Sequence, residues 1–179
     1  MIQVREATAP DSDAVADLLT ASWRDAYAPL LPAAVLDRLP ALHRDMWRAH
    51  FAAPRDGIVL LAEEDGALAG FCAAWLEDGE CYVDNLHLRP GRRGGGLGPL
   101  LLGEAAAALA ARGATRAALT IIEGNDRAAR FYARLGGIAQ PPHPAELHGA
   151  RVMFRRFAWP DIAALVAACA VPAPSDRTE

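Results

Sequence analysis

The 179-residue sequence predicts an α/β fold in which helices flank a mixed, mostly antiparallel central sheet. Three observations lead to this prediction. The spacing of apolar residues switches between the period of two that strands show and the period of about 3.6 that helices show. Two Asp-Gly pairs separate three consecutive strand-like segments, which is typical of an antiparallel meander. A glycine-rich segment then connects the third of these strands to a long apolar helix.

The first third of the chain is predicted to hold one strand and two helices. Residues 2–6 alternate between apolar and polar side chains, as a strand does. Thr8 and Asp11 have the spacing of a capping box, with Asp in place of Glu, and helical periodicity follows towards Tyr27. Two prolines interrupt it, and a second helix is expected over residues 33–51. The inner side of that helix is predicted to carry Val35, Leu36, Leu39, Leu42, Met46 and Trp47.

Three strands are predicted next, at residues 57–63, 67–76 and 81–88. The turns between them fall at Asp65-Gly66 and Asp78-Gly79, because Asp and Gly tolerate the positive φ angles that a two-residue hairpin turn requires. Neighbouring strands that are joined by such short turns must run antiparallel.

The C-terminal half is predicted to alternate between helices and strands without an internal repeat or a linker. Its predicted elements are a helix at 99–112, a strand at 116–122, a helix at 125–135, one or two final strands that include 151–157, and a short helix at 161–170. Residues 1–159 therefore form one predicted domain. Residues 160–179 form a short helix and a tail that is expected to be disordered.

The overall composition indicates a cytoplasmic protein and excludes several classes of function. The formal net charge is −4, so the chain has no overall positive field for nucleic acid. The cysteines and histidines match neither a metal motif nor a disulfide framework. The N-terminus lacks the apolar stretch of a signal peptide, and no apolar run reaches membrane-spanning length. We therefore expect no nucleic-acid, membrane or metal partner.

The glycine-rich segment at residues 93–98 has the features of a phosphate-binding loop. Glycines let a backbone turn tightly and approach a ligand closely, and the helix that follows adds free N–H groups and the positive end of its dipole. Arg92 and Arg93 are expected to add positive charge at the mouth of the loop. A P-loop is excluded because the sequence contains no lysine, and the glycine spacing does not complete a dinucleotide-binding fingerprint.

Two motifs around this segment resemble those of the GNAT superfamily of acyl-CoA-dependent N-acyltransferases. The first reads Leu86-His87-Leu88-Arg89-Pro90, then Arg93-x-x-Gly96-x-Gly98 and an apolar helix. The second, which also follows a predicted strand, reads Asn125-x-x-Ala128-x-x-Phe131-Tyr132-x-x-x-Gly136. The order of predicted elements resembles the same fold over nearly the whole chain, and the segment at 23–32 is similar to a branch that is common in bacteria.

This resemblance implies an N-acetyltransferase that moves the acetyl group of acetyl-CoA directly to a primary amine. It also implies that two neighbouring strands, 81–88 and 116–122, diverge and bind the pantetheine arm through their backbone groups. The residues that it implies for cofactor binding are Leu86, His87, Leu88, Arg93, Gly94, Gly95, Gly96, Leu97, Gly98, Asn125, Ala128 and Tyr132. Asn125 also suits the N-cap of its helix. Pro99 departs from the family pattern, because it offers no N–H to the phosphates.

The resemblance assigns Tyr132 as the acid that protonates the departing thiolate. The base is open, because Tyr82 occupies the position where many family members have a glutamate. Asp84 and Glu80 fall on the same side of the strand as Tyr82 if no bulge intervenes, and either could act through water. Both also suit a purely structural role.

The acceptor pocket is expected on the far side of the thioester. Its predicted lining residues are Trp23, Tyr27, Trp75 and Tyr82, and the predicted ammonium partners are Asp25 and Asp84. The acceptor is a small-molecule or peptide amine that the sequence does not identify, and a homodimer is left open. The alternative function is a non-catalytic acyl-CoA-binding or sensor module with the same fold. A nucleotide-dependent oxidoreductase is disfavoured by the incomplete fingerprint.

Overall fold

The structure, a computed structural model, describes residues 1–92 and 95–170. A 3₁₀ turn at Ala9–Asp11 precedes the first helix. The helices and strands are β1 (Ile2–Glu6), α1 (Ser12–Tyr27), α2 (Ala33–Ala52), β2 (Gly57–Glu64), β3 (Ala67–Glu77), β4 (Glu80–Leu88), α3 (Leu97–Ala110), β5 (Arg116–Ile122), α4 (Asp126–Arg134), β6 (Ile138–Ala139), β7 (His143–Leu147), β8 (Ala150–Trp159) and α5 (Ile162–Cys169). Arg93, Gly94 and the tail at 172–179, for which we made sequence predictions, lie outside the described residues.

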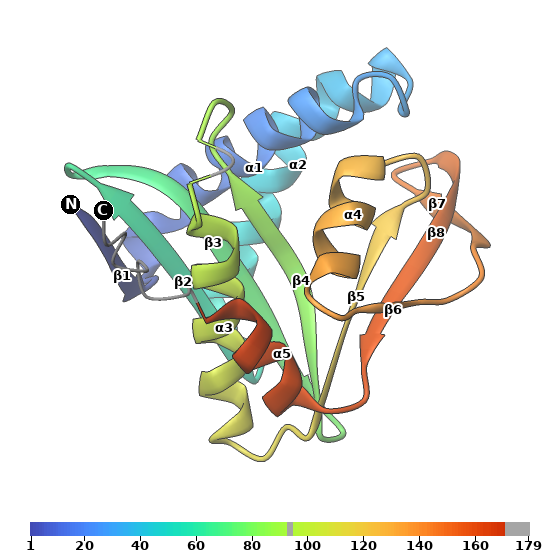
Figure 1. The fold of residues 1–179 in the computed structure, drawn as a ribbon. Helices are drawn as coiled ribbons and strands as arrows, with labels where there is room; N and C mark the ends of the chain where they lie inside the picture. The colour runs from blue at the N-terminus through green and yellow to red at the C-terminus, as the bar shows by residue number, and fades with distance from the viewer. Residues whose placement is uncertain (93–94, 171–179) are drawn as a thin grey trace, which may run out of the picture.

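These strands form one sheet in the order β1-β2-β3-β4-β5-β8-β6, and β7 also pairs with β8 (Figure 1). Strands β2, β3 and β4 form the predicted antiparallel meander. Strands β4 and β5 run parallel, and the other described pairs are antiparallel. The predicted mixed, mostly antiparallel α/β fold is confirmed.

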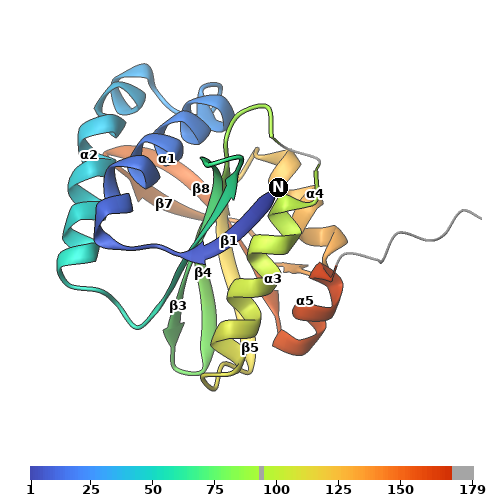
Figure 2. The same cartoon turned by 90° about the vertical axis from the view of Figure 1, so that its left-hand side faces the viewer.

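The helices cover both faces of the sheet. Helices α1 and α2 pack on one face, whereas α3, α4 and α5 lie on the other (Figure 2). The apolar face of α3 and α5 forms the larger core with the sheet, and it includes Leu101, Leu109 and Leu165. The α1/α2 face has its own core around Leu19, Trp47, Phe71 and Trp75. Burial of apolar surface on both faces is what fixes the sheet between the two layers.

The first two helices follow their sequence signals with one exception. The backbone N–H of Thr8 donates to the Asp11 carboxylate at 2.8 Å, which confirms the capping box. Helix α2 continues through Pro40. The prediction that Met46 faces inward was wrong, because its side chain is 42% exposed. His43 is buried on that face instead, since residues 39, 43 and 47 continue the helical repeat.

Two-residue turns with positive φ angles join neighbouring antiparallel strands at three places. Asp65 and Gly66 have φ angles of 51° and 79°, as a type I′ hairpin turn requires, and Asp78 and Gly79 are similar. His148, with φ 51°, and Gly149, with φ 85°, form a further turn that joins β7 to β8. Of the one or two final strands that were predicted, β8 contains residues 151–157, and β7, which begins at His143, pairs along it.

His43 makes the stability of this fold depend on pH. The Thr20 hydroxyl donates to the Ala16 carbonyl at 2.9 Å, so its oxygen accepts from His43 Nδ1 at 2.8 Å. Burial, and to a smaller extent His148, lowers the pKa of His43 from 6.5 to about 4. Between these two values the unfolded chain binds a proton at this position that the native state does not bind.

We therefore expect the free energy of unfolding to fall as the pH drops from 7 to 5. The contribution of His43 is up to about 2 kcal/mol. Urea unfolding of the wild type and of His43→Gln at both pH values measures it. The variant should lose less stability than the wild type over this interval. An equal loss in both proteins would show that His43 is not responsible.

Candidate active site

The candidate site is the opening between β4 and β5. Within the described residues, pairing between these parallel strands stops at Val83 and Leu119, although both strands continue. Beyond that point the strands diverge, as Figure 1 shows. The backbone groups from Asp84 to Leu88 on this edge are therefore not used by β5. Unpaired backbone N–H and C=O groups require another partner, so this edge suits an extended ligand that carries amides.

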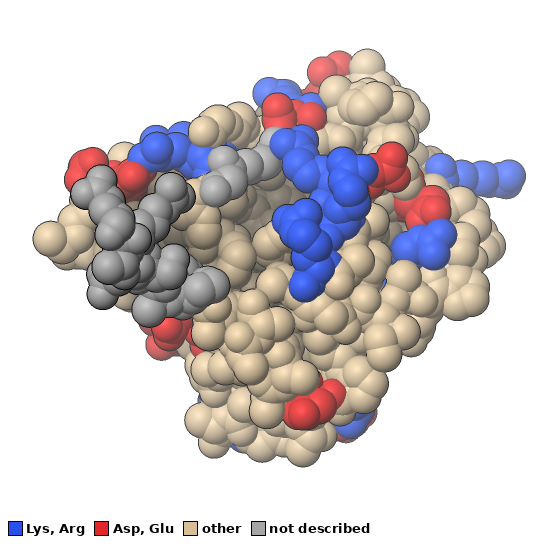
Figure 3. All heavy atoms as spheres, in the orientation of Figure 1, with Lys and Arg blue, Asp and Glu red and all other residues tan. Residues whose placement is uncertain are grey.

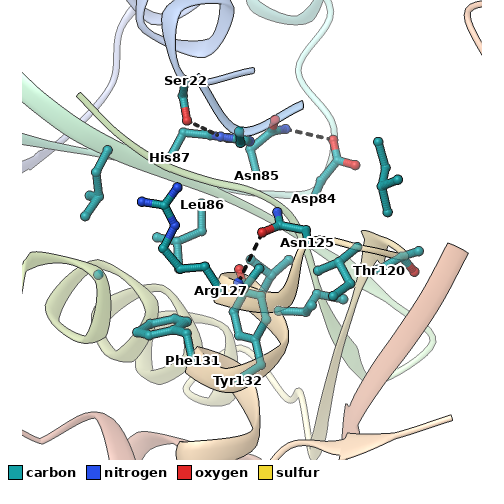
Figure 4. Close-up of a pocket in the computed structure, with 18 of the residues that line it drawn as sticks. Ser22, Asp84, Asn85, Leu86, His87, Thr120, Asn125, Arg127, Phe131 and Tyr132 are labelled. Atoms are coloured by element: carbon teal, nitrogen blue, oxygen red, sulfur yellow. Dashed lines mark hydrogen bonds between the residues drawn. The ribbon is translucent and has the colours of Figure 1, made fainter. Parts of the chain in front are cut away.

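A cavity of about 760 Å³ occupies this opening. Its walls come from α1, β4, the beginning of α3, β5, α4 and the β7–β8 hairpin. Figure 4 shows that residues from α1 and β4 approach it from one side, and that Tyr132 and Phe131 of α4 approach it from the other. The predicted residues Leu86, His87, Leu88, Asn125, Ala128 and Tyr132 all line it.

A bulge in β4 controls which side chains face each side of this cavity. The pairing between β3 and β4 shifts between Ala73 and Ala74, and Asp84 is the extra residue in β4. Tyr82 and His87 pair with Trp75 and Phe71, which belong to the α1/α2 core. Glu80, Tyr82 and Asp84 were predicted to share one side of the strand only if no bulge intervened. That condition is not met for Asp84, because the bulge interrupts the alternation of side chains along β4.

The glycine-rich loop ends in an N-terminus that leaves room for a ligand. Gly96 caps α3 with φ 78° and ψ −4°, in the left-handed region. A Cβ atom added at Gly95 or Gly96 would meet no atom within 4 Å, so both positions adjoin open space. At Gly98, by contrast, an added Cβ would lie 3.3 Å from Phe131 Cζ, so glycine lets α4 approach α3 closely.

The first N–H groups of α3 have no partner within the helix, which makes this N-terminus suitable for an anion. Gly96, Gly98 and Pro99 line the cavity, whereas Gly95 and Leu97 do not. The Leu97 side chain is buried in the core, so only its backbone is available to a ligand. Arg92 forms an ion pair with Glu64 at the end of β2. The positive charge of Arg92, which was predicted to act at the mouth of the loop, is therefore already paired with a carboxylate of the protein.

Asn125 connects α4 to α1. Its side-chain oxygen accepts a hydrogen bond from the Ala128 N–H at 3.2 Å, which confirms the predicted N-cap. Its amide also bonds to the hydroxyl of Tyr27. Burial raises the pKa of Tyr27, and the hydrogen bond from Asn125 opposes that rise. Both residues line the cavity, Tyr27 from α1 and Asn125 from the beginning of α4.

Tyr132 reaches the cavity from the buried face of α4. Its ring packs against Phe131, Phe157 and Trp159, with centroids 5.0–6.2 Å apart. Burial raises the pKa of Tyr132 far above its ordinary value. The hydroxyl therefore stays protonated at neutral pH and can donate a hydrogen bond to a group in the cavity.

The structure does not bring all the predicted residues together. Glu80 lies outside the cavity lining, and it pairs with Arg116 at 3.3 Å and with Arg156 at 2.6 Å. Trp75 also lies outside the lining, because its ring is buried in the α1/α2 core. Trp23, Tyr27, Tyr82 and Asp84 do line the cavity. Asp84 accepts a hydrogen bond from the Asn85 amide at 3.1 Å.

Sequence reasoning missed a serine–histidine pair. Ser22 of α1 is buried, and its Oγ lies 3.0 Å from Nδ1 of His87 on β4 (Figure 4). Both residues line the cavity. His87 was predicted only as a cofactor-binding residue, because its contact with α1 joins positions 65 residues apart. No local spacing signals a contact of that length.

Neither a metal nor a cysteine nucleophile is indicated by the described residues. They contain no group of three or more His, Cys, Asp or Glu side chains that could hold a metal ion. Cys72, Cys81 and Cys169 are all buried. Burial, and to a smaller extent Glu80, raises the pKa of Cys81 to about 12, so its thiolate is scarce at neutral pH. Among the described helices, none is long and apolar enough to cross a membrane.

Comparisons with known proteins agree with this architecture. The profile of the Acetyltransferase (GNAT) family matches residues 14–137. YuaI of Bacillus subtilis (strain 168), an uncharacterized N-acetyltransferase, is 27% identical over 176 residues, which span 92% of this chain and 96% of YuaI.

Two solved structures have the same fold. The PaiA N-acetyltransferase of Thermoplasma acidophilum, in complex with coenzyme A, matches with a TM-score of 0.70 and 18% identity over 87% of this chain and 98% of its own. YncA of Salmonella typhimurium, solved with acetyl-CoA, matches with a TM-score of 0.66 and 18% identity over 98% of this chain and 99% of its own. The chain belongs to the GNAT family of acetyl-CoA-dependent acetyltransferases.

Proposed function

We propose that this protein transfers the acetyl group of acetyl-CoA directly to a primary amine. The observation that carries the proposal is the opening between β4 and β5, which leads from the N-terminus of α3 to a cavity that two layers of the fold share. One end of this opening suits a diphosphate. Its middle suits an amide-bearing arm, and the α1 side is open to a second substrate.

The residues present fit coenzyme A. The N–H groups at Gly95–Gly98 suit the diphosphate, because helix N-termini favour anions and the glycines allow close approach. The free edge of β4 at Leu86 and Leu88 suits the pantetheine amides and the thioester carbonyl. When bound, acetyl-CoA supplies an activated acyl group with a thiolate as its leaving group. A backbone N–H at this edge stabilises negative charge on the carbonyl oxygen.

Tyr132 is the proposed proton donor to the departing thiolate. Tyr132 lines the cavity, and burial holds its hydroxyl in the neutral form. Asn125 lies in the same cavity, and the hydrogen bond that its side-chain oxygen accepts from the Ala128 N–H orders the beginning of α4. The position of Tyr132 in the cavity and the ordered beginning of α4 support the role that the family motif implies for Tyr132.

His87 and Asp84 are the proposed proton acceptors on the amine side. Glu80 is withdrawn from this role, since two arginines already hold its carboxylate. Ser22 fixes the His87 ring from α1, and imidazole accepts protons near neutral pH more readily than a carboxylate does. Asp84 suits the binding of the incoming ammonium, directly or through water.

The lining of the cavity favours an acceptor with a single amine. Asp84 is the one carboxylate among its described lining residues. The surroundings on the α1 side are largely apolar or aromatic, with Trp23, Tyr27, Leu147 and Phe154. A polyamine requires several anionic partners, whereas a small molecule or peptide with one amine on an apolar body fits this surface. A cytoplasmic location and a homodimer stay predictions from the sequence.

Release of free thiol from acetyl-CoA tests the proposal. The purified protein is incubated with acetyl-CoA alone, and then with an arylalkylamine, a peptide with a free N-terminus, or spermidine. We expect amine-dependent thiol release, with a larger kcat/KM for the first two amines than for spermidine. Acetyl-CoA binding without amine-dependent turnover across a wide panel would favour the non-catalytic sensor.

A further inference from the structure

Three arginines form a stripe along α4. Arg127, Arg130 and Arg134 are three and four residues apart, which places them on one side of a helix. All three line the cavity. Figure 3 shows basic side chains gathered beside the hollow in the middle of this face. We call these three residues the α4 arginine stripe. The sequence analysis gave it no role.

Acidic side chains neutralise little of the positive charge of the α4 arginine stripe. Arg127 lies 3.9 Å from Asp25, at the limit of an ion pair. Within the described residues, the side chains of Arg130 and Arg134 form no hydrogen bond or ion pair. Arg155 and Arg156, on the neighbouring β8, are instead held by Glu123 and Glu80. The chain has a formal net charge of −4, so the stripe concentrates positive charge on a protein that is negatively charged overall. Unpaired like charges along one cavity wall favour an anionic ligand.

That anionic ligand group differs from the diphosphate that is proposed to bind at the α3 N-terminus. The N–H groups around Gly96 and Gly98 already suit a diphosphate, as described above. From Arg127 to Arg134 the stripe extends about 10 Å along the helix axis, which is longer than one diphosphate. Phe131, between Arg130 and Arg134 in sequence, contacts Gly98. The stripe therefore begins beside the diphosphate position and continues beyond it.

We propose that Arg130 and Arg134, assisted by Arg127, bind the 3′-phosphate on the ribose of coenzyme A. This inference rests on the proposed function. The 3′-phosphate is the second anionic group of coenzyme A, and as a phosphate monoester it carries a charge approaching −2 at neutral pH. Guanidinium groups bind phosphate oxygens through paired N–H donors, so two arginines one helical turn apart can hold one monoester from two directions.

Coenzyme A and 3′-dephospho-coenzyme A, which differ only in this phosphate, provide the test. Calorimetry measures the Kd of each for the wild type and for the double variant Arg130→Ala, Arg134→Ala. We expect the wild type to bind coenzyme A about 10- to 100-fold more tightly than the dephospho form. In the double variant this ratio should approach one, mainly through weaker binding of coenzyme A. Arg151→Ala is the control, since it removes an exposed arginine from β8, outside the cavity lining.

The possible failures are distinguishable. Equal affinity of the wild type for both ligands would overturn this inference and leave the proposed function intact. If the double variant keeps the wild-type preference for coenzyme A over the dephospho form, this inference is likewise overturned and the proposed function is unaffected. An equal loss of affinity for both ligands would assign the stripe to the diphosphate instead. Binding of neither ligand to the wild type would overturn the proposed function, and the inference with it. Thermal unfolding of each variant shows that the fold is retained.

Discussion

Replacing Tyr132 with Phe is expected to lower kcat for amine acetylation by about 100-fold. The substitution removes one oxygen from a buried ring that packs against Phe131, Phe157 and Trp159. The packing is retained, so the free energy of unfolding should change little. The departing thiolate, however, loses its proposed proton donor. Steady-state kinetics with the best amine of the panel measure the effect.

Tyr27→Phe is the matched control for this prediction. It removes a hydroxyl from the same cavity, but that hydroxyl bonds to Asn125. We expect it to change kcat much less than Tyr132→Phe does. The Kd of coenzyme A should be similar in both variants and the wild type. If Tyr132→Phe leaves kcat unchanged across pH, another group or water protonates the thiolate.

Replacing Gly96 with Asp is expected to weaken binding of coenzyme A by about 100-fold. Gly96 has φ 78°, a conformation that Asp adopts more readily than most residues do. The added side chain meets no atom within 4 Å of its Cβ, so it can be accommodated. Its carboxylate then lies at the position proposed for the diphosphate, where like charges repel. Calorimetry with coenzyme A measures the loss.

Gly96→Asn separates this charge effect from backbone strain. Asn has nearly the same shape as Asp and a similar tolerance of positive φ, but it carries no charge. We expect its affinity for coenzyme A to stay close to that of the wild type. High salt should reduce the difference between the two variants in their Kd for coenzyme A, because salt screens the repulsion between the carboxylate and the diphosphate. Similar affinities of Asp and Asn variants at low salt would place the diphosphate away from Gly96.

Much of the fold was predictable because its signals are local. The Asp-Gly turns and the capping box at Thr8 each depend on a few adjacent residues. Strand β5 was predicted with the bounds that the structure shows. The two motifs that resemble the family also lie in short segments, at the beginning of α3 and at the beginning of α4. Residues from both motifs line the same cavity.

The remaining features depend on contacts between distant segments. The bulge at Asp84 is visible only in the pairing of β4 with β3, so alternation along one strand could not reveal it. Glu80 is removed from the candidate site by two arginines from β5 and β8. His87 obtains its partner from α1. Met46 is exposed although it was predicted to face inward, and His43 is buried, because a histidine with a hydroxyl partner fits the helical repeat as well as an apolar residue does.

A crystal structure of the protein with coenzyme A tests the central claim most directly. Our account predicts the diphosphate at the N–H groups of Gly95–Gly98. It places the pantetheine arm along the free edge of β4 near Leu86 and Leu88, with its sulfur close to the Tyr132 hydroxyl. Coenzyme A bound outside the opening between β4 and β5, or with its sulfur remote from Tyr132, would contradict the account.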